Sequence, residues 1–337
     1  MLGIDPTTYR PVVQGAVDLA PQIAQITAAV QDAGYDNLWL IGSGGSYGTM
    51  LPWELLVQQR STLPVRAAIG AELQLVGSPL LGSRSVAVFS SLSGTTSETV
   101  AAARYCRERG VTVIGLTGEA GTPLAELSDH VLVNAADNAT AAESINLQLL
   151  LLVTGLLARR GEFDDWDRLA AELQAMPDLL LAVNADEDAR AAEFAESHRD
   201  TTYHMLVGAG NLWGQTYNYS MCVLEEMQWL TTTRVHGAEF FHGSLELIEP
   251  DTSLILLFGE DRTRPLMDRV LKFADQYCKD VTVLDTASHE LPGISPEFRE
   301  LLSPIVSGVM CTRQSKHLER VREHSLDLRR YYRVVEY

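Results

Sequence analysis

A dense group of hydroxyl side chains follows one of the apolar runs of the sequence. Residues 90–99 contain seven Ser or Thr residues around Gly94, between the apolar run 86–89 and helix-forming residues that begin at Val100. This pattern predicts a buried strand followed by a helix, and the first turn of that helix offers free backbone N–H groups. Those donors, the helix dipole and the hydroxyls suit a phosphate. A simple helix cap would need only one hydroxyl, so we predict a phosphate-binding loop.

Carboxylate and imidazole side chains gather in the second half of the chain. Glu225 and Glu226 are followed within eighteen residues by His236, Glu239 and His242. Together these two side-chain types move protons at neutral pH. We interpret Glu225 as part of a solvated helix face, and we predict that Glu226 and His242 form an acid–base pair. The alternative is that Glu226 is also solvated and that both histidines are loop residues.

The composition restricts the partners. A net charge of −18 disfavours nucleic acid and anionic membranes, and it requires that any phosphate be held by local groups. The four cysteines are scattered, and the spacing of His236 and His242 is not that of an HExxH zinc motif, so we expect no metal. Gly42 and Gly44 lack the third glycine of a dinucleotide-binding loop.

The location is also constrained by the apolar segments. The first residues lack the basic-then-apolar order of a signal peptide. The apolar run 149–158 is shorter than a membrane span. We therefore expect a cytoplasmic protein and no membrane contact.

Alternating strands and helices must position these groups. Apolar runs predict strands at 37–41, 64–68, 86–89, 111–116 and 131–133, with helices at about 49–60, 100–109, 122–128 and 142–158 between and after them. This alternation is typical of an α/β fold with a parallel sheet covered on both faces. Residues 10–34 are predicted to be helical with a break near Pro21, and residues 166–198 to form acidic helices. Glu143, Ser144 and Asn146 open the last helix of the first half, either at a pocket edge or as caps.

The second half repeats the first. Glycines at 42, 44 and 48 recur at 208, 210 and 214, and strands at 203–207, 253–258 and 281–284 give a period near 168 residues. After the strand at 253–258 the hydroxyls are replaced by Glu260 and Asp261, which would repel a phosphate. We expect one functional site for the two halves. The predicted organisation is a helical segment 1–34, domain 35–160, a helical connection 161–200 and domain 201–337.

The two loops resemble those of the sugar isomerase (SIS) domain family in its double-domain form. Residues 44–47 (GGSY) are similar to the first loop of that family, and residues 91–96 (SLSGTT) to its phosphate loop. The resemblance implies two tandem SIS domains, each a flavodoxin-like αβα sandwich with a parallel sheet. It also implies phosphate ligands at Ser46, Ser91, Ser93 and Thr96, beside Gly44 and Gly45.

The acid–base pair resembles that of the isomerase domain of glucosamine-6-phosphate synthase. Glu226 and His242 are separated as in that domain, and residues 238–243 (AEFFHG), with Glu239, are similar to its Gly-Glu-x-x-His-Gly segment. The resemblance implies that Glu226 is the proton-moving base and that His242 acts on a sugar oxygen from the neighbouring subunit. It therefore implies a homodimer with shared active sites.

The end of the chain resembles that of the fructosamine-6-phosphate deglycases. Residues 328–337 (LRRYYRVVEY) lack the lysine that the synthase carries there. The resemblance implies a phosphorylated sugar–amine substrate, an Amadori compound, which is cleaved without a cofactor to glucose 6-phosphate and an amine. Arg329 and Arg330 are predicted either to hold a substrate carboxylate or to lie on a basic surface. The alternatives are an aldose–ketose isomerase, an amino-sugar-phosphate deaminase or a sugar-phosphate-binding regulator.

Overall fold

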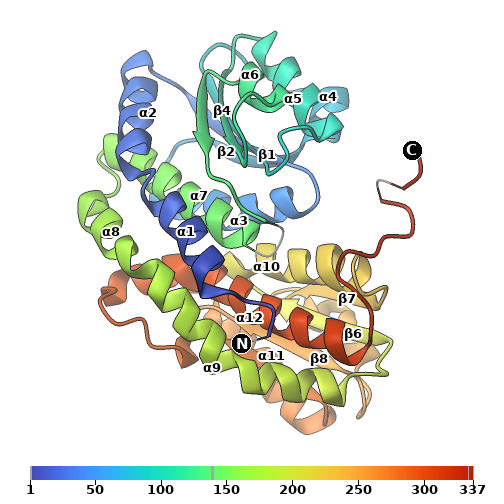
Figure 1. Ribbon diagram of the computed structural model, residues 1–337. Helices are drawn as coiled ribbons and strands as arrows, with labels where there is room; N and C mark the ends of the chain where they lie inside the picture. The colour runs from blue at the N-terminus through green and yellow to red at the C-terminus, as the bar shows by residue number, and fades with distance from the viewer. Residues whose placement is uncertain (1, 138–139, 333, 337) are drawn as a thin grey trace. The chain divides into compact units, whose positions relative to one another are not determined.

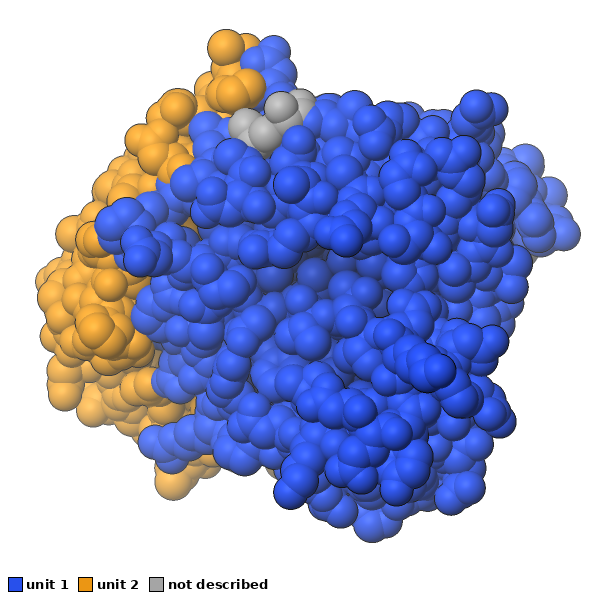
Figure 2. Space-filling model, turned by 90° about the horizontal axis from the view of Figure 1, so that it is seen from below, with its two compact units in different colours: residues 1–5, 179–292, 299–337 blue, residues 6–178, 293–298 orange. Residues whose placement is uncertain are grey.

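The computed structural model describes residues 2–137, 140–332 and 334–336. The chain forms two compact units, which Figure 2 colours separately. Unit 2 comprises Pro6–Asp178 and Gly293–Phe298, and unit 1 comprises Met1–Asp5, Leu179–Pro292 and Arg299–Tyr337. Each unit is described by itself.

Unit 2 is built on a five-stranded parallel sheet with the strand order β2-β1-β3-β4-β5. The strands are β1 (Asn37–Gly42), β2 (Val65–Ile69), β3 (Ser85–Ser91), β4 (Thr112–Thr117) and β5 (His130–Val133). The helices are α1 (Pro6–Val17), α2 (Ala20–Ala33), α3 (Gly45–Arg60), α4 (Gly70–Val76), α5 (Ser97–Arg107), α6 (Pro123–Leu127), α7 (Ala141–Arg159) and α8 (Trp166–Glu172), with the short helices η1 (Leu173–Ala175) and η7 (Pro296–Phe298). The strands predicted in the first half are confirmed, and so is the helix break, because α2 restarts beside Pro21.

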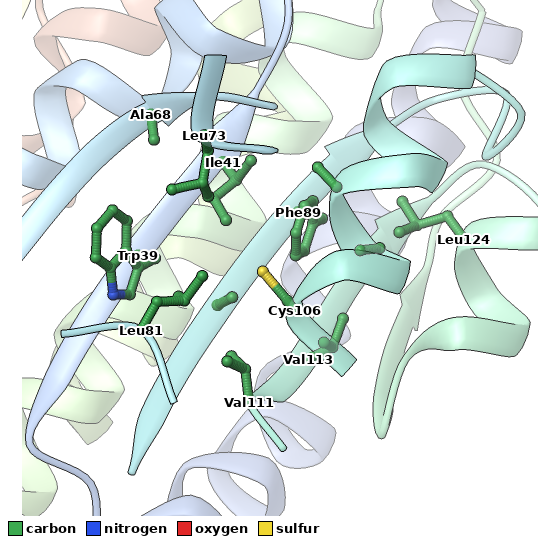
Figure 3. Close-up of a cluster of buried hydrophobic side chains, with 13 residues drawn as sticks. Trp39, Ile41, Ala68, Leu73, Leu81, Phe89, Cys106, Val111, Val113 and Leu124 are labelled. Atoms are coloured by element: carbon green, nitrogen blue, oxygen red, sulfur yellow. The ribbon is translucent and has the colours of Figure 1, made fainter. Parts of the chain in front are cut away.

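Alternate side chains of the strands in unit 2 face opposite layers of helices. Trp39, Ile41 and Phe89 point to one face, where they pack with Cys106 of α5 and Leu124 of α6 (Figure 3). Helix α7 packs with α1, α2 and α3. This helix is long and apolar enough to cross a membrane, but 78% of its most apolar stretch is buried inside the structure. Its apolar surface is therefore accounted for by helix packing.

Unit 1 contains a four-stranded parallel sheet with the order β7-β6-β8-β9. The strands are β6 (Tyr203–Gly208), β7 (Thr231–His236), β8 (Leu254–Phe258) and β9 (Val281–Asp285). The helices are α9 (Met176–Ser197), α10 (Trp213–Tyr217), α11 (Arg264–Tyr277) and α12 (Arg299–Val321), with the π-helix η3 (Asn218–Glu225) and the 3-10 helices η2 (Gly210–Leu212), η4 (Phe240–His242), η5 (Ser244–Leu247) and η6 (Thr286–Ser288) (Figure 1). The order around β6 repeats the order around β1, as the duplicated pattern predicts.

One strand of unit 1, β7, departs from the sequence pattern. The pattern does not predict β7, because Thr231, Thr232, Thr233 and Arg234 show no apolar alternation. The strand nevertheless forms at the edge of the sheet, where its backbone pairs with β6 and His236 lies opposite Gly208. His236 therefore ends a strand, and the alternative that it is a loop residue is wrong.

Candidate active site

The hydroxyl-rich loop of unit 2 lies at the point where the strand order reverses. From β1 the chain continues to β2 on one side and then to β3 on the other, and Ile41 of β1 is level with Phe89 of β3. The loops after β1 and β3 therefore open at the same edge of the sheet. In open parallel sheets this crevice is the usual ligand site.

The loop after β3 has a fixed backbone. Gly94 has a φ of +61°, and a Cβ there would lie 2.1 Å from the Thr122 hydroxyl oxygen. The Gly94 carbonyl accepts from the backbone N–H of Leu124 at 3.0 Å, and the Leu92 carbonyl accepts from that of Gly118 at 2.9 Å. Only glycine fits this close approach. The loop is thus held against the start of α6.

The hydroxyls of this loop contact one another. The oxygens of Ser91 and Thr96 are 3.2 Å apart, and Ser93 Oγ accepts from the N–H of Thr95 at 3.3 Å and from its hydroxyl at 3.0 Å. Thr96 is the N-cap of α5, but its side chain makes no cap hydrogen bond. Side-chain capping therefore does not explain these hydroxyls, and the N–H groups of the first turn remain available to an anion.

The loop after β1 faces open space. Gly44 is the N-cap of α3 with a φ of +55°, and a Cβ there would meet nothing within 4 Å. At Gly42, by contrast, a Cβ would lie 2.6 Å from the backbone of Ser46 and Tyr47. The strand thus turns tightly into α3 and leaves room beside Gly44. Ser46 and Gly45 lie in the first turn of α3, at the same edge of the sheet as Ser91.

A buried carboxyl group lies near the start of α7. Glu143 is 2% exposed, and burial raises its pKa to about 7, with a further contribution from the charge of Asp137. Ser144 accepts a hydrogen bond from Asn134 Nδ2 at 2.7 Å, and Asn146 is also buried. The side chain of the N-cap residue Thr140 makes no cap hydrogen bond.

In unit 1, Glu226 directly follows a wide helical segment. Its N–H donates to the carbonyl of Met221 five residues earlier, at 3.1 Å, which is π-helical geometry. Such segments are rare and occur often at functional sites. Glu225 accepts from the Thr232 hydroxyl and from Arg234 at 3.3 Å. It therefore contacts β7 and does not lie on the solvated helix face that the sequence predicts.

The C-terminal segment contacts the same turn. Arg329 Nε lies 2.8 Å from Glu226 Oε1. The guanidinium of Arg330 lies over the Trp229 ring, 4.1 Å from its centroid. The sequence offers no signal for this ion pair, because about a hundred residues separate its members. The C-terminal segment thus brings Arg329 and Arg330 to the turn that carries Glu226.

His242 lies elsewhere in unit 1. It is exposed at the end of η4, as is the neighbouring Glu239. The preceding Phe240 and Phe241 pack on Phe273 of α11. The helix η4 is therefore anchored to the face of the sheet that α11 covers.

Glu226 is carried on the other face. Val235 belongs to the apolar cluster with α11 residues, whereas the adjacent Arg234 reaches Ser220 and Glu225 of η3. Neighbouring strand residues point to opposite faces, so η3 and η4 cover opposite sides of β7. The residues Glu226 and His242 of one chain do not meet in one pocket of unit 1.

The corresponding crevice of unit 1 is filled by the chain itself. Asp261 is 7% exposed in the loop after β8. Its carboxylate accepts from the N–H of Asn211 at 2.7 Å, and from the N–H and hydroxyl of Thr263 at 2.8 and 2.6 Å. Glu260 pairs with Arg299 at 2.8 Å. Within the described ranges no group of three or more His, Cys, Asp or Glu residues is placed to hold a metal.

Known proteins share this architecture. The SIS domain family matches residues 33–158. Fructosamine deglycase FrlB of Bacillus subtilis is 32% identical over 307 residues, which cover 90% of this chain and 93% of that protein. Fructoselysine 6-phosphate deglycase of Escherichia coli K12 is 24% identical, with coverage of 94% and 92%.

Solved structures agree with this match. A crystal structure from Bacillus subtilis, assigned as a phosphosugar isomerase, superposes with a TM-score of 0.88 at 30% identity, over 94% of this chain and 97% of the other. Its fold supports two tandem domains of the kind found here. The chain therefore belongs to the SIS domain family of sugar-phosphate enzymes, in its double-domain form.

Proposed function

We propose that this protein is a deglycase that cleaves a 6-phosphorylated fructosamine, an Amadori compound, into glucose 6-phosphate and a free amine. The observation that carries the proposal is the hydroxyl-rich loop after β3, with its fixed backbone at Gly94, in a chain 32% identical to a fructosamine deglycase. The phosphate would bind to Ser46, Ser91, Ser93, Thr96 and the N–H groups at the start of α5. Binding energy remote from the reacting carbon would then position the sugar.

The chemistry is a proton transfer followed by hydrolysis. Glu226 removes a proton from C1, and the electron pair forms the C1–C2 double bond of an enaminol. His242 donates a proton to the ring oxygen when the ring opens, or to the C2 oxygen when the enaminol forms. Protonation at C2 then leaves a C1–N imine, and water adds to C1 and expels the amine. No metal or organic cofactor takes part in this scheme.

The active site is proposed to be shared between two subunits. In one chain, η3 and η4 cover opposite faces of the unit 1 sheet, so a single sugar would take Glu226 from one chain and His242 from another. A homodimer with two such sites satisfies this requirement. A shared site also explains why His242 is exposed in the single chain.

The substrate class is tested with a panel of compounds. Purified protein is incubated with fructosamine 6-phosphates of several amino acids, with fructose 6-phosphate and with glucosamine 6-phosphate. We expect glucose 6-phosphate and free amine only from the fructosamines. Turnover restricted to fructose 6-phosphate or glucosamine 6-phosphate would contradict the proposal and favour an isomerase or a deaminase.

The shared site predicts complementation between inactive variants. Glu226→Gln and His242→Ala should each lose about 10²–10⁴-fold in kcat, with unchanged melting temperature. After unfolding and refolding an equal mixture, half of the dimers would be mixed, each with one intact site, so about a quarter of wild-type activity should return. Glu225→Gln is the matched control. Activity that stays at the level of the single variants would overturn the shared site.

A further inference from the structure

The turn that carries Glu226 is held by the segment that follows α12 (red in Figure 1). Gln228 Nε2 donates to the carbonyl of His324 at 2.8 Å, and the rings of Trp229 and His324 are 4.3 Å apart. Trp229 and Glu323 are the only non-glycine residues in the described part of the chain with a positive φ. Both strained residues thus lie at one junction, and such strain is often found at functional sites.

Arg329 reaches Glu226 from this junction through the Nε side of its guanidinium. Nη1 donates to the carbonyls of Leu326 and Leu328 at 2.7 and 2.8 Å, and Nε contacts Glu226 Oε1 at 2.8 Å. Nε and Nη2 form one edge of a guanidinium, and that edge matches both oxygens of a carboxylate. Nε of this edge contacts Glu226. A substrate carboxylate that faces this edge squarely takes both donors.

The contact with Arg329 opposes the role proposed for Glu226. A guanidinium stabilises the ionised form of a carboxylate and so weakens it as a base. The Arg329 side chain is 16% exposed and that of Glu226 is 29% exposed, so solvent screens the pair only in part. The base would act most strongly after Arg329 has moved to another anion.

The proposed substrate contains such an anion at the right place. In an Amadori compound of an α-amino group, the carboxylate carbon is three bonds from C1, through the nitrogen and the α-carbon. Glu226 must touch the proton on C1, so an arginine in contact with Glu226 lies beside that carboxylate. In a compound joined through a distant amine, the carboxylate is several carbons further away.

We propose that Arg329 is a specificity-determining residue that pairs with Glu226 in the free enzyme and transfers to the substrate carboxylate next to the C1 nitrogen. The transfer rests on the proposed function. It removes the Arg329 contact from Glu226 when a suitable substrate is bound and keeps that contact when no such carboxylate is present. No bond is made or broken in this step.

The test compares two substrates that differ only in the carboxylate. The fructosamine 6-phosphate of glycine is compared with that of ethylamine, in which a methyl group replaces the carboxylate. Wild-type protein should favour the glycine compound by about 10–100-fold in kcat/KM, the range expected for a charged hydrogen-bonded pair. Arg329→Gln should reduce this preference to less than about threefold.

The direction of the change in kcat for the ethylamine compound distinguishes transfer of Arg329 from structural damage. Arg329→Gln should raise kcat for the ethylamine compound while it lowers kcat/KM for the glycine compound. Arg320→Gln is the matched control, because Arg320 lies on α12 and faces Glu196 at 3.9 Å. If Arg329→Gln does not fold, Arg329→Lys, which keeps the charge but loses the two-donor edge, should also reduce the preference.

Two results would overturn the proposal in different ways. A variant that loses activity equally on both compounds, or keeps the wild-type preference, would show that Arg329 is structural and would leave the proposed function intact. Wild-type protein that releases glucose 6-phosphate from neither compound would contradict the proposed function and, with it, the transfer of Arg329.

Discussion

The corresponding loops of the two units have the same backbone conformation at Gly44 and Gly210. They differ in the side chains that lie in front of these glycines. Gly44 in unit 2 and Gly210 in unit 1 both begin their loops with a φ of +55°. In front of Gly44 there is open space within 4 Å, whereas a Cβ at Gly210 would lie 2.3 Å from Asp261 Oδ2 and 2.2 Å from Thr263 Oγ1. The same turn thus faces open space in one unit and a carboxylate in the other.

This difference indicates how one scaffold supports two roles. A loop at the carboxyl end of parallel strands presents backbone N–H groups to an anion. In unit 1 that anion belongs to the chain, because Asp261 accepts the Asn211 and Thr263 N–H groups. In unit 2 the hydroxyls of Ser91, Ser93 and Thr96 leave the position uncharged. The comparison therefore supports the proposal that unit 2 binds the phosphate.

The largest expected effect comes from copying the unit 1 arrangement into unit 2. Ser93→Asp places a carboxylate in the hydroxyl loop, where it should repel a phosphate and compete for the same N–H groups. We expect kcat/KM to fall about 10³-fold, because several charged hydrogen bonds are lost together. Steady-state kinetics measures the change, with Ser93→Asn as the neutral control. Equal losses in the two variants would show that size, and not charge, is responsible.

A smaller effect should distinguish the two glycines. Gly210→Ala adds left-handed strain and an overlap with Asp261, so we expect a loss of about 3 kcal/mol in the free energy of unfolding and unchanged KM. Gly44→Ala adds only strain, about 1 kcal/mol, but its methyl group enters the open space and should raise KM. Urea denaturation and kinetics on both variants provide the measurements. If both glycines affected KM alike, the contrast between filled and open crevices would be wrong.

The last comparison concerns one carboxyl group in each unit. Asp285 of unit 1 pairs with Arg264 at 2.9 Å, which lowers the pKa of Asp285 despite its desolvation by burial. Glu143 of unit 2 is buried and its pKa is raised to about 7. The folded chain therefore holds a proton on Glu143 that the unfolded chain releases above about pH 4.5, so this group makes stability fall as pH rises from about 4.5 to about 7.

Removing the ionisable group should remove that dependence. Glu143→Gln should be about 2–3 kcal/mol more stable than wild type at pH 8 and similar to it at pH 4. Urea denaturation at both pH values measures the difference. A gain that is the same at both pH values would mean that the proton on Glu143 is not its source.

The sequence predicts the parts of this structure that depend on local pattern. The apolar runs specify β1, β3 and β4, because buried parallel strands are apolar on both faces. The hydroxyls around Gly94 predict a phosphate-binding loop, because this prediction also depends only on local composition. Strand β7 escapes prediction because Thr231–His236 is polar and forms only by pairing with β6.

Long-range contacts lie outside the reach of such patterns. The pairing of Arg329 with Glu226 joins the end of the chain to a π-helical turn, and no spacing rule connects them. The separation of Glu226 and His242 on opposite faces likewise depends on how η3 and η4 pack on one strand. Residue types indicate the proposed chemistry, and tertiary packing decides on which face of the sheet each group lies.

The carboxylate of Asp261 gives unit 1 an internal counterpart of a bound ligand. Because Asp261 accepts the N–H groups of Asn211 and Thr263, these backbone donors of unit 1 are satisfied within the chain. The duplicated loop of unit 1 is thus closed by a side chain of its own chain, at the position where the proposed function puts a phosphate in unit 2.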